Sequence, residues 1–320
     1  MHLKDLKHVT STRQLEDTEI LDELYAITDD MERRDSRHDL NRASLRGRLL
    51  ANVFYEPSTR TRFSFDAAMQ KLGGRIIDTE SAGHFSSVTK GETLEDTIRI
   101  IAGYADVIVL RHNVTGSAMR ASSVSDVPVI NAGDGTGEHP TQALLDMYTI
   151  KRELGRTDNY TLSMIGDLKH GRTIHSLLHL VSLYPNVKVN LASPEELKLP
   201  EEYKEYLMIK KIPFEEHFNI ESILENSDVL YVTRIQKERF SSLEDYERVK
   251  GSYIINKESL WKMKKDAVIM HPLPRVDEIS PEVDTDKRAA YFRQAKNGMY
   301  VRMALLQSLL KRKNGNENSY

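Results

Sequence analysis

The segment Phe54–Gly74, which reads FYEPSTRTRFSFDAAMQKLGG, contains an unusual concentration of hydroxyl and guanidinium side chains. Consecutive residues carry them: Ser58, Thr59, Arg60, Thr61 and Arg62. A short apolar run precedes these residues and a helix-forming segment follows, so they lie at a predicted change from strand to helix. The N-terminus of a helix offers unpaired backbone N–H groups and the positive end of the helix dipole, and arginine adds paired donors. The segment therefore has the components of a phosphate or oxyanion site, although Ser58 and Thr59 are also typical of ordinary helix N-caps.

Comparable polar clusters follow other predicted strands. They are Arg111–His112, His139–Gln142, Lys169–Thr173, Arg234–Gln236 and His271–Arg275. Ligands of parallel α/β sheets bind outside the carboxyl ends of the strands, where loops and helix N-termini converge. Each cluster by itself has a plainer interpretation, such as a helix start at His139 or a surface ion pair of Arg234. Together the clusters predict a binding site for a ligand with several negative charges.

The elements that must position these residues alternate along the chain. Short apolar runs of strand character are separated by segments of helical period over almost the whole length, which is typical of βαβ units and parallel sheets. A chain of 320 residues is long enough for two domains, each with its own core. The predicted fold class is therefore α/β, with two doubly wound domains whose sheets are parallel and which are joined by shared helices.

The boundary between the two domains is predicted at the helix 139–155, without a flexible linker. The first domain would comprise residues 1–138, completed by a C-terminal helix over about 292–312. The second domain would comprise residues 139–291, and the polar residues 313–320 would form a disordered tail.

Two of the predicted helices carry more specific expectations. In the helix that follows the arginines, Phe63, Ala67 and Leu72 recur near the helical spacing and would share one apolar face. The long final helix, from Ala289 onward, contains Gly298 and is expected to be partly interrupted there.

Composition and charge exclude several classes of protein. The chain is 39% hydrophobic and 29% charged with a net charge of −3, which gives no general attraction to nucleic acid or to anionic membranes. It contains no cysteine, and this excludes disulfides, thiolate metal ligands and a cysteine nucleophile. The N-terminal segment has no apolar signal region and no stretch reaches the length of a membrane span, so a cytoplasmic location is expected. The glycine-bearing turns at 133–138 and 166–173 match neither the dinucleotide fingerprint nor the phosphate-binding P-loop.

Several blocks of the sequence occur in an order that resembles a known family. The blocks are FYEPSTRTRFSFDAAMQKLGG, KGETLEDT, VLRH, HPTQALLD, IGDLKHGRTIHSL, TRIQKERF, HPLPRVDEI and YFRQA. Over roughly Leu45–Leu310 the chain resembles the catalytic chains of the aspartate carbamoyltransferases, within the aspartate/ornithine carbamoyltransferase superfamily. The resemblance implies a carbamoyl phosphate-binding domain, an aspartate-binding domain, and a homotrimer with active sites at the subunit interfaces.

The reaction that the resemblance implies is transfer of the carbamoyl group from carbamoyl phosphate to the amine of L-aspartate. The products are N-carbamoyl-L-aspartate and phosphate, in an early step of de novo pyrimidine biosynthesis. No metal or organic cofactor is expected, because the substrate arrives already activated. The protein must orient two anions and stabilise charge on the carbonyl oxygen and on the leaving phosphate. No Asp, Glu or Cys emerges as a general base in this set, so we hypothesise that the leaving phosphate accepts the amine proton.

The resemblance also implies roles for individual residues. The carbamoyl phosphate site matches Ser58, Thr59, Arg60, Thr61, Arg111, His139, Gln142, Pro272 and Leu273. Within that set the catalytic positions are Arg60, Thr61, Arg111 and His139. The aspartate site matches Lys90, Arg172, Arg234 and Gln236. Ser86 and Lys90 match residues that the neighbouring subunit supplies, so a monomer would lack a complete site.

Two other functions compete with this prediction. An ornithine carbamoyltransferase shares the phosphate loop, but it must recognise a cationic chain end and typically has a cysteine in an H-C-L-P sequence. The sequence HPLPR and the absence of cysteine favour aspartate. A non-catalytic scaffold homologue is the alternative from a different class, and neither nucleic acid nor membrane is expected as a partner. Whether a regulatory chain joins the trimer in a larger assembly stays open, as does the effect of His170, where many relatives carry tyrosine.

Overall fold

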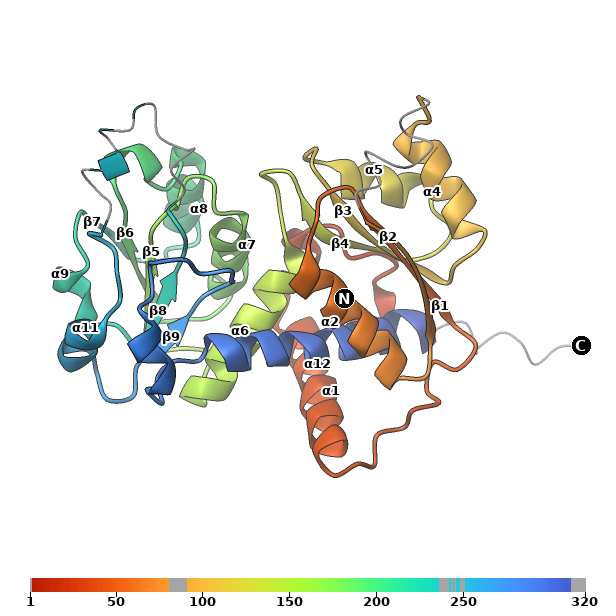
Figure 1. The fold of residues 1–320 in the computed structure, drawn as a ribbon, viewed down its shortest axis with the longest axis horizontal. Coiled ribbons are helices and arrows are strands. Elements are labelled where there is room, and N and C mark those ends of the chain that lie inside the picture. Colours follow the sequence, from red (N-terminus) through yellow and green to blue (C-terminus); the bar gives the residue numbers. More distant parts are fainter. Residues whose placement is uncertain are drawn as a thin grey trace, which may run out of the picture. The chain divides into compact units, whose positions relative to one another are not determined.

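The computed structural model describes residues 2–80, 91–235, 242, 244, 246–247 and 251–311. The chain forms two compact units, one from residues 1–144 with 296–320 and the other from residues 145–295. The division falls within helix α6 (Pro140–Leu154) and within helix α12 (Tyr291–Leu310), so both units share these two helices (Figure 1). The predicted α/β class with shared helices is confirmed.

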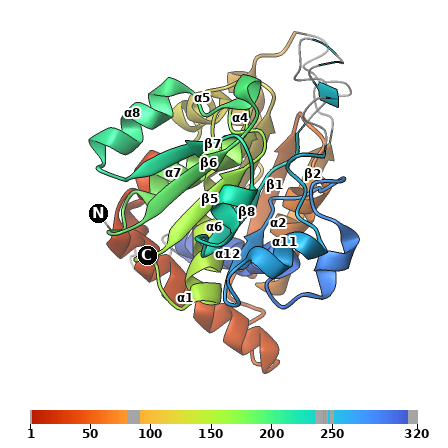
Figure 2. The ribbon, with the colours of Figure 1, turned by 90° about the vertical axis from the view of Figure 1, so that its left-hand side faces the viewer.

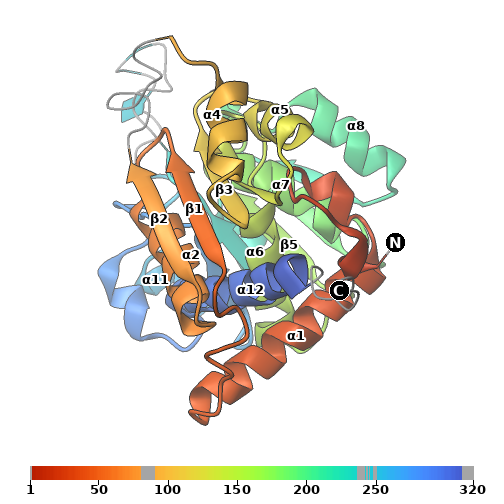
Figure 3. The same ribbon diagram turned by 90° about the vertical axis from the view of Figure 1, so that its right-hand side faces the viewer.

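The first unit contains a four-stranded, wholly parallel sheet in the order β2–β1–β3–β4. Its strands are β1 (Leu49–Phe54), β2 (Arg75–Glu80), β3 (Val107–His112) and β4 (Val129–Asp134). Helices α1 (Thr18–Ser36), α2 (Thr59–Lys71), α4 (Leu94–Ala102) and α5 (Ser117–Val124) belong to the same unit. Figure 3 shows β1 and β2 side by side, and their register pairs Phe54 with Glu80 at the carboxyl edge.

The second unit contains a five-stranded parallel sheet in the order β7–β6–β5–β8–β9. Its strands are β5 (Thr161–Ile165), β6 (Lys188–Ala192), β7 (Phe214–His217), β8 (Val229–Val232) and β9 (Val268–Met270). Its other helices are α7 (Arg172–Val181), α8 (Glu201–Ile209), α9 (Glu221–Leu224) and α11 (Lys257–Lys262). Figure 2 shows β5, β6 and β7 running beside one another. The edge strand β7 was not predicted, because its sequence, FEEH, has charged residues at its centre and no buried position.

Short 3₁₀ helices complete the described secondary structure. They span Leu3–Asp5, Thr12–Leu15, Glu195–Leu197 and Pro281–Thr285.

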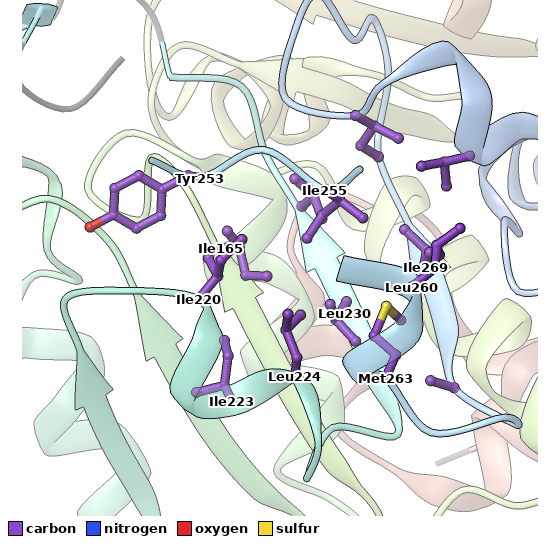
Figure 4. Close-up of a cluster of buried hydrophobic side chains, with 14 of the residues drawn as sticks. Ile165, Ile220, Ile223, Leu224, Leu230, Tyr253, Ile255, Leu260, Met263 and Ile269 are labelled. Carbon is purple, nitrogen blue, oxygen red and sulfur yellow. The ribbon is translucent and has the colours of Figure 1, made fainter. Parts of the chain in front are cut away.

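A cluster of buried apolar side chains fixes the strands β5, β8 and β9 of the second unit (Figure 4). Ile165, Leu230 and Ile269 come from these three strands, one residue from each. The remaining labelled side chains come from α9, α11 and the segments around them: Ile220, Ile223, Leu224, Tyr253, Ile255, Leu260 and Met263. Complete burial of a large aliphatic side chain stabilises a fold by roughly 1.5–3 kcal/mol. This core therefore holds the strand ends from which the polar segments at 166–173, 233–235 and 271–275 emerge.

The predicted apolar face of α2 is wrong in one respect. Phe63 is 58% exposed, whereas Phe65, Ala68 and Met69 are fully buried. Phe63 and Phe65 are each followed by apolar residues at helical spacing, so periodicity did not show which of the two helix faces is buried. The choice was made by packing, since Phe65 also contacts Arg302 of α12, whose guanidinium carbon lies 4.9 Å from the ring centre.

The predicted interruption of the final helix at Gly298 is also wrong, because α12 runs unbroken from Tyr291 to Leu310. A glycine inside a helix costs only about 1 kcal/mol relative to alanine. Burial on the following turns outweighs that cost, since Val301, Ala304 and Leu305 are completely inaccessible to solvent. None of the helices in the described part of the chain combines the length and the hydrophobicity that a membrane span requires.

Candidate functional site

The polar segment after β1 forms the beginning of helix α2. Ser58 is the N-cap in an extended conformation, and its hydroxyl accepts no capping hydrogen bond from the described helix. Thr59 begins the helix, and the described first turn contains no acidic residue that would offset the positive end of the dipole. Ser58 therefore occupies the N-cap position without the hydrogen bond that an ordinary cap makes, and the hydroxyl and the N–H groups of this turn can serve an anion.

The two arginines of this turn have different surroundings. Partial burial lowers the pKa of the Arg60 guanidinium although the residue is exposed to solvent, and no ion pair to Arg60 forms within the described residues. Arg62 instead lies 3.5 Å from the carboxylate of Asp78 on β2 and contacts the Phe63 ring. A desolvated cation is stabilised by an anion that approaches it closely. Arg60 therefore has the electrostatics of a ligand-binding arginine, whereas Arg62 has those of a structural one.

Arg111 stands at the carboxyl end of β3, next to the end of β1. The register pairs it with Phe54, and the Tyr55 amide donates to its carbonyl over 2.8 Å. The Arg111 guanidinium donates to the carbonyl of Ala132 at 3.1 Å and lies 3.3 Å from the carboxylate of Glu56. The strand pairing thus brings Arg111 to the same sheet edge as the start of α2.

An aromatic pair lies next to Arg111. The rings of Tyr55 and His112 are 4.3 Å apart between centres. Burial raises the pKa of the Tyr55 phenol, and burial together with the nearby Arg120 lowers the pKa of His112. Both side chains are therefore neutral near pH 7 and add no charge to this edge of the sheet.

His139 and Gln142 lie at the start of α6, one helical turn apart. Both side chains are buried, at 4% and 9% exposure, and the backbone N–H of Gln142 donates to the His139 carbonyl over 2.9 Å. The ring nitrogen Nδ1 of His139 is 3.5 Å from the hydroxyl of Thr141. Buried polar side chains at a helix start can present fixed hydrogen-bond donors to a small ligand.

A network of acidic side chains holds the turn before His139, and sequence analysis missed it. Asp134 accepts hydrogen bonds from the backbone N–H groups of Gly116 and Glu138 at 2.7 and 3.0 Å. Its Oδ1 also accepts from the amide of Asn131 at 3.1 Å. The carboxylate of Glu138 accepts from the hydroxyl of Ser11 at 2.7 Å, and it also binds Thr12. The sequence GDGTGE contains these acids, but nothing local in it indicates partners more than a hundred residues away.

In the second unit, two predicted arginines follow the neighbouring strands β5 and β8. Arg172 is the first residue of α7, and Arg234 follows β8 in a half-buried position. The register pairs Ile165 with Val232, so both arginines emerge from the same edge of the sheet. Gly166, at φ +110°, permits this arrangement, because a Cβ there would lie 2.2 Å from the carbonyl oxygen of Thr233.

His170, which departs from the family pattern, binds within its own loop. Its backbone N–H donates to Asp167 at 2.9 Å, and its ring Nδ1 lies 3.2 Å from both carboxylate oxygens. The Arg172 backbone N–H donates to the His170 carbonyl at 3.0 Å. The histidine therefore helps to shape the turn that carries Arg172.

The segment 271–275 follows β9 and presents the last predicted residues, Pro272 and Leu273. Leu273 has a positive φ of 55°, and its peptide bond to Pro274 is cis. The Leu273 N–H donates to Nδ1 of His271 over 2.7 Å. Ser86, Lys90 and Gln236, also predicted for the site, lie outside the described residues. Among the described side chains, no group of three or more His, Asp and Glu could hold a metal ion.

Comparison with known proteins gives matches over both units. Residues 7–152 match the family model of the aspartate/ornithine carbamoyltransferase carbamoyl-P binding domain. Residues 158–309 match the model of the Asp/Orn binding domain of the same family.

The relatives and solved structures agree with these matches. The chloroplastic aspartate carbamoyltransferase of Oryza sativa subsp. japonica is 52% identical over 299 residues, covering 92% of this chain and 82% of the relative. The aspartate carbamoyltransferase catalytic subunit of Thermoplasma acidophilum is 50% identical over 308 residues, covering 94% and 98%.

Among solved structures, the catalytic subunit of M. jannaschii aspartate transcarbamoylase has a TM-score of 0.91 and 49% identity, and the match covers 97% of this chain and 100% of that one. Aspartate transcarbamoylase from Trypanosoma cruzi, in complex with carbamoyl phosphate and aspartate, has a TM-score of 0.88 and 40% identity, with 95% of each chain covered. The chain belongs to the aspartate/ornithine carbamoyltransferase family.

Proposed function

We propose that this protein transfers the carbamoyl group of carbamoyl phosphate to the amine of L-aspartate, giving N-carbamoyl-L-aspartate and phosphate. The observation that carries the proposal is the match of nearly the whole chain to aspartate carbamoyltransferases at about half identity. A related structure has carbamoyl phosphate and aspartate bound. The first unit would then bind carbamoyl phosphate and the second L-aspartate, in accordance with the family models that they match.

The phosphate group of the first substrate would bind at the start of α2. Ser58, Thr59 and Thr61 offer hydroxyl and backbone donors there, and Arg60 adds an exposed guanidinium. Arg111 would reach the same group from the end of β3. In the reaction the carbon–oxygen bond to phosphate breaks and negative charge passes to the leaving group. Fixed donors at this position stabilise that charge without reorganisation.

The carbamoyl group would be held from both ends. Thr61, Arg111 and His139 would donate to the carbonyl oxygen, on which charge develops when the amine attacks the carbon. Gln142 and the carbonyls of Pro272 and Leu273 would bind the NH₂ group. The amine proton would pass to the leaving phosphate, so that no protein carboxylate has to act as the base.

The carboxylates of aspartate would bind to Arg172, Arg234 and Gln236. Planar guanidinium groups bind carboxylates through two parallel hydrogen bonds, which lysine cannot do. Ser86 and Lys90 would reach the site from the neighbouring subunit of a homotrimer, and a regulatory chain could add to that assembly. The cytoplasm is the proposed location and pyrimidine biosynthesis the proposed pathway, although several relatives are named as chloroplastic.

Replacing Arg234 with lysine should raise the KM for aspartate by about tenfold or more, because the charge remains while the paired geometry is lost. The KM for carbamoyl phosphate should change much less. Arg156→Lys is the matched control in the same unit, since Arg156 is an exposed residue 3.8 Å from Asp228. Steady-state kinetics with each substrate varied in turn measures both constants. Equal increases in the two KM values would contradict the assignment of Arg234 to aspartate.

The reaction itself is tested by incubating the purified chain with carbamoyl phosphate and either L-aspartate or L-ornithine. Carbamoylated product with aspartate alone, from a species with the mass of three chains, is the expected result. Product with ornithine instead would contradict the proposed specificity. Absence of product from an assembled trimer would favour the non-catalytic scaffold, the alternative from a different class.

A further inference from the structure

The segment 271–278 has an unusual backbone that its own residues stabilise. Leu273 has a φ of 55°, in the left-handed region that branched and bulky residues rarely adopt. Such a conformation persists only when the surrounding contacts determine it. The proposed function assigns the carbonyl of this residue to the carbamoyl NH₂ group, so the contacts that set its direction bear on substrate binding.

His271 makes the contact closest to that backbone. Its Nδ1 is 2.7 Å from the backbone nitrogen of Leu273, and its Nε2 is 2.6 Å from Oε1 of Glu278. A backbone N–H can only donate, so Nδ1 must be the unprotonated acceptor. Nε2 therefore carries the proton and donates it to Glu278. The imidazole ring thus joins the Leu273 backbone to a carboxylate in one defined tautomer.

Glu278 closes the other side of the segment. Its Oε2 accepts hydrogen bonds from the backbone N–H groups of Val276 and Asp277, at 3.1 and 3.2 Å. His271 and Glu278 are only 2% and 5% exposed. Burial alone would raise the pKa of Glu278, but the hydrogen bonds from His271 and from backbone N–H groups outweigh it and lower that pKa. The carboxylate is therefore charged at neutral pH, and each of its oxygens has a donor.

A second chain of hydrogen bonds ties His271 to the interior of the unit. The His271 backbone N–H donates to the side-chain oxygen of Gln294 at 2.9 Å. The amide nitrogen of Gln294 donates to Asp146 at 2.6 Å, and Asp146 also accepts from the hydroxyl of Tyr231 on β8 at 2.7 Å. The backbone of His271 is thus attached to the buried interior of the unit, and the Leu273 backbone is attached to the His271 imidazole.

We propose that His271 and Glu278 are positioning residues for carbamoyl phosphate, which hold the carbonyls of Pro272 and Leu273 in the direction that receives the carbamoyl NH₂ group. This inference rests on the proposed function. Neither residue touches the substrate: His271 acts through the Leu273 backbone, and Glu278 acts through His271 and the backbone of the segment.

Two substitutions of His271 separate its two contacts. In His271→Asn the side-chain oxygen can take the place of Nδ1 and accept from Leu273, whereas the donor to Glu278 is lost. In His271→Gln the amide nitrogen can take the place of Nε2 and donate to Glu278, whereas the Leu273 N–H loses its acceptor. A buried N–H without a partner is the costlier loss for the backbone. We expect His271→Gln to raise the KM for carbamoyl phosphate about tenfold above that of His271→Asn, with similar KM values for aspartate.

The assembled protein is used throughout, and thermal unfolding is measured for each variant. Equal KM values for carbamoyl phosphate in the two His271 variants would overturn the inference, as would a parallel rise in both substrates' KM values that follows the loss of stability. Glu278→Gln gives a second test that does not require the His271 variants to fold. Its amide cannot accept on both sides, so the KM for carbamoyl phosphate should rise severalfold, and an unchanged KM would count against the inference.

Glu282→Gln is the control for Glu278→Gln, because Glu282 is an exposed residue that accepts a hydrogen bond from the Lys257 amide. It should have the kinetics of the unmodified protein. Failure of the unmodified protein to carbamoylate aspartate would contradict the proposed function, whereas an active protein with unaffected variants would contradict only the role of His271 and Glu278.

Discussion

Replacing Arg60 with alanine is expected to lower kcat by at least about 10²-fold, the effect typical of losing a donor to charge that develops in a transition state. Arg60 lies in the first turn of α2, where the N–H groups and the dipole already favour an anion. Partial burial lowers the pKa of its guanidinium, while the residue stays exposed to solvent and open to a ligand. Steady-state rates at saturating carbamoyl phosphate and aspartate measure the effect.

Arg62→Ala is the matched control for this substitution. It removes the same group from the same helix, but Arg62 lies beside Asp78 and Phe63 and has no proposed part in the reaction. Partly exposed ion pairs of this kind contribute about 0–1 kcal/mol to stability, so the Arg62 variant should stay folded. Because Arg62 is not assigned to either substrate, its rate should stay close to that of the unmodified protein. A near-normal rate for Arg60→Ala, or an equal loss in both variants, would show that the start of α2 is not the phosphate site.

Replacing Asp134 with alanine is expected to lower the free energy of unfolding by about 3 kcal/mol, since a buried donor without its acceptor costs about 1–3 kcal/mol. The backbone N–H groups of Gly116 and Glu138 and the amide of Asn131 all lose an acceptor. Because Glu138 directly precedes His139, we also expect a lower kcat. Urea unfolding followed by circular dichroism measures the stability, and the same preparation gives the rate.

Asp126→Ala is the control for Asp134, because Asp126 is an exposed aspartate in the loop that leads into β4. Its removal should change the free energy of unfolding by less than about 0.5 kcal/mol. If the two aspartate variants were equally stable, the hydrogen bonds to Asp134 would not hold the turn before His139.

Local patterns in the sequence were sufficient to predict the order and the type of most helices and strands. The strands at Leu49–Phe54 and Val107–His112 are short apolar runs, and the helix at Leu94–Ala102 has its apolar residues at helical spacing. The places of Arg60 and Arg111 could be predicted for the same reason, because Arg60 lies shortly after one recognisable strand and Arg111 lies at the carboxyl end of another. Parallel strands then bring their carboxyl ends to one edge.

Contacts between distant parts of the chain decided the remainder. Periodicity could not tell that Phe65 rather than Phe63 faces the core, or that the packing of α12 would carry a helix through Gly298. It also did not reveal that Glu138 binds Ser11 and Thr12, since its carboxylate gains those partners only when the N-terminal segment returns to the end of β4.

The sequence by itself therefore determined the α/β class and the groups that follow the strands, because strand and helix patterns and turn residues act over a few positions. The tertiary structure alone decided which polar groups hold those segments in place, as the contact between Ser11 and Glu138 does for the turn before His139. The physical reason is that a buried polar group requires a hydrogen-bond partner. The fold can bring that partner from any position in the chain, so its separation in sequence does not reveal it.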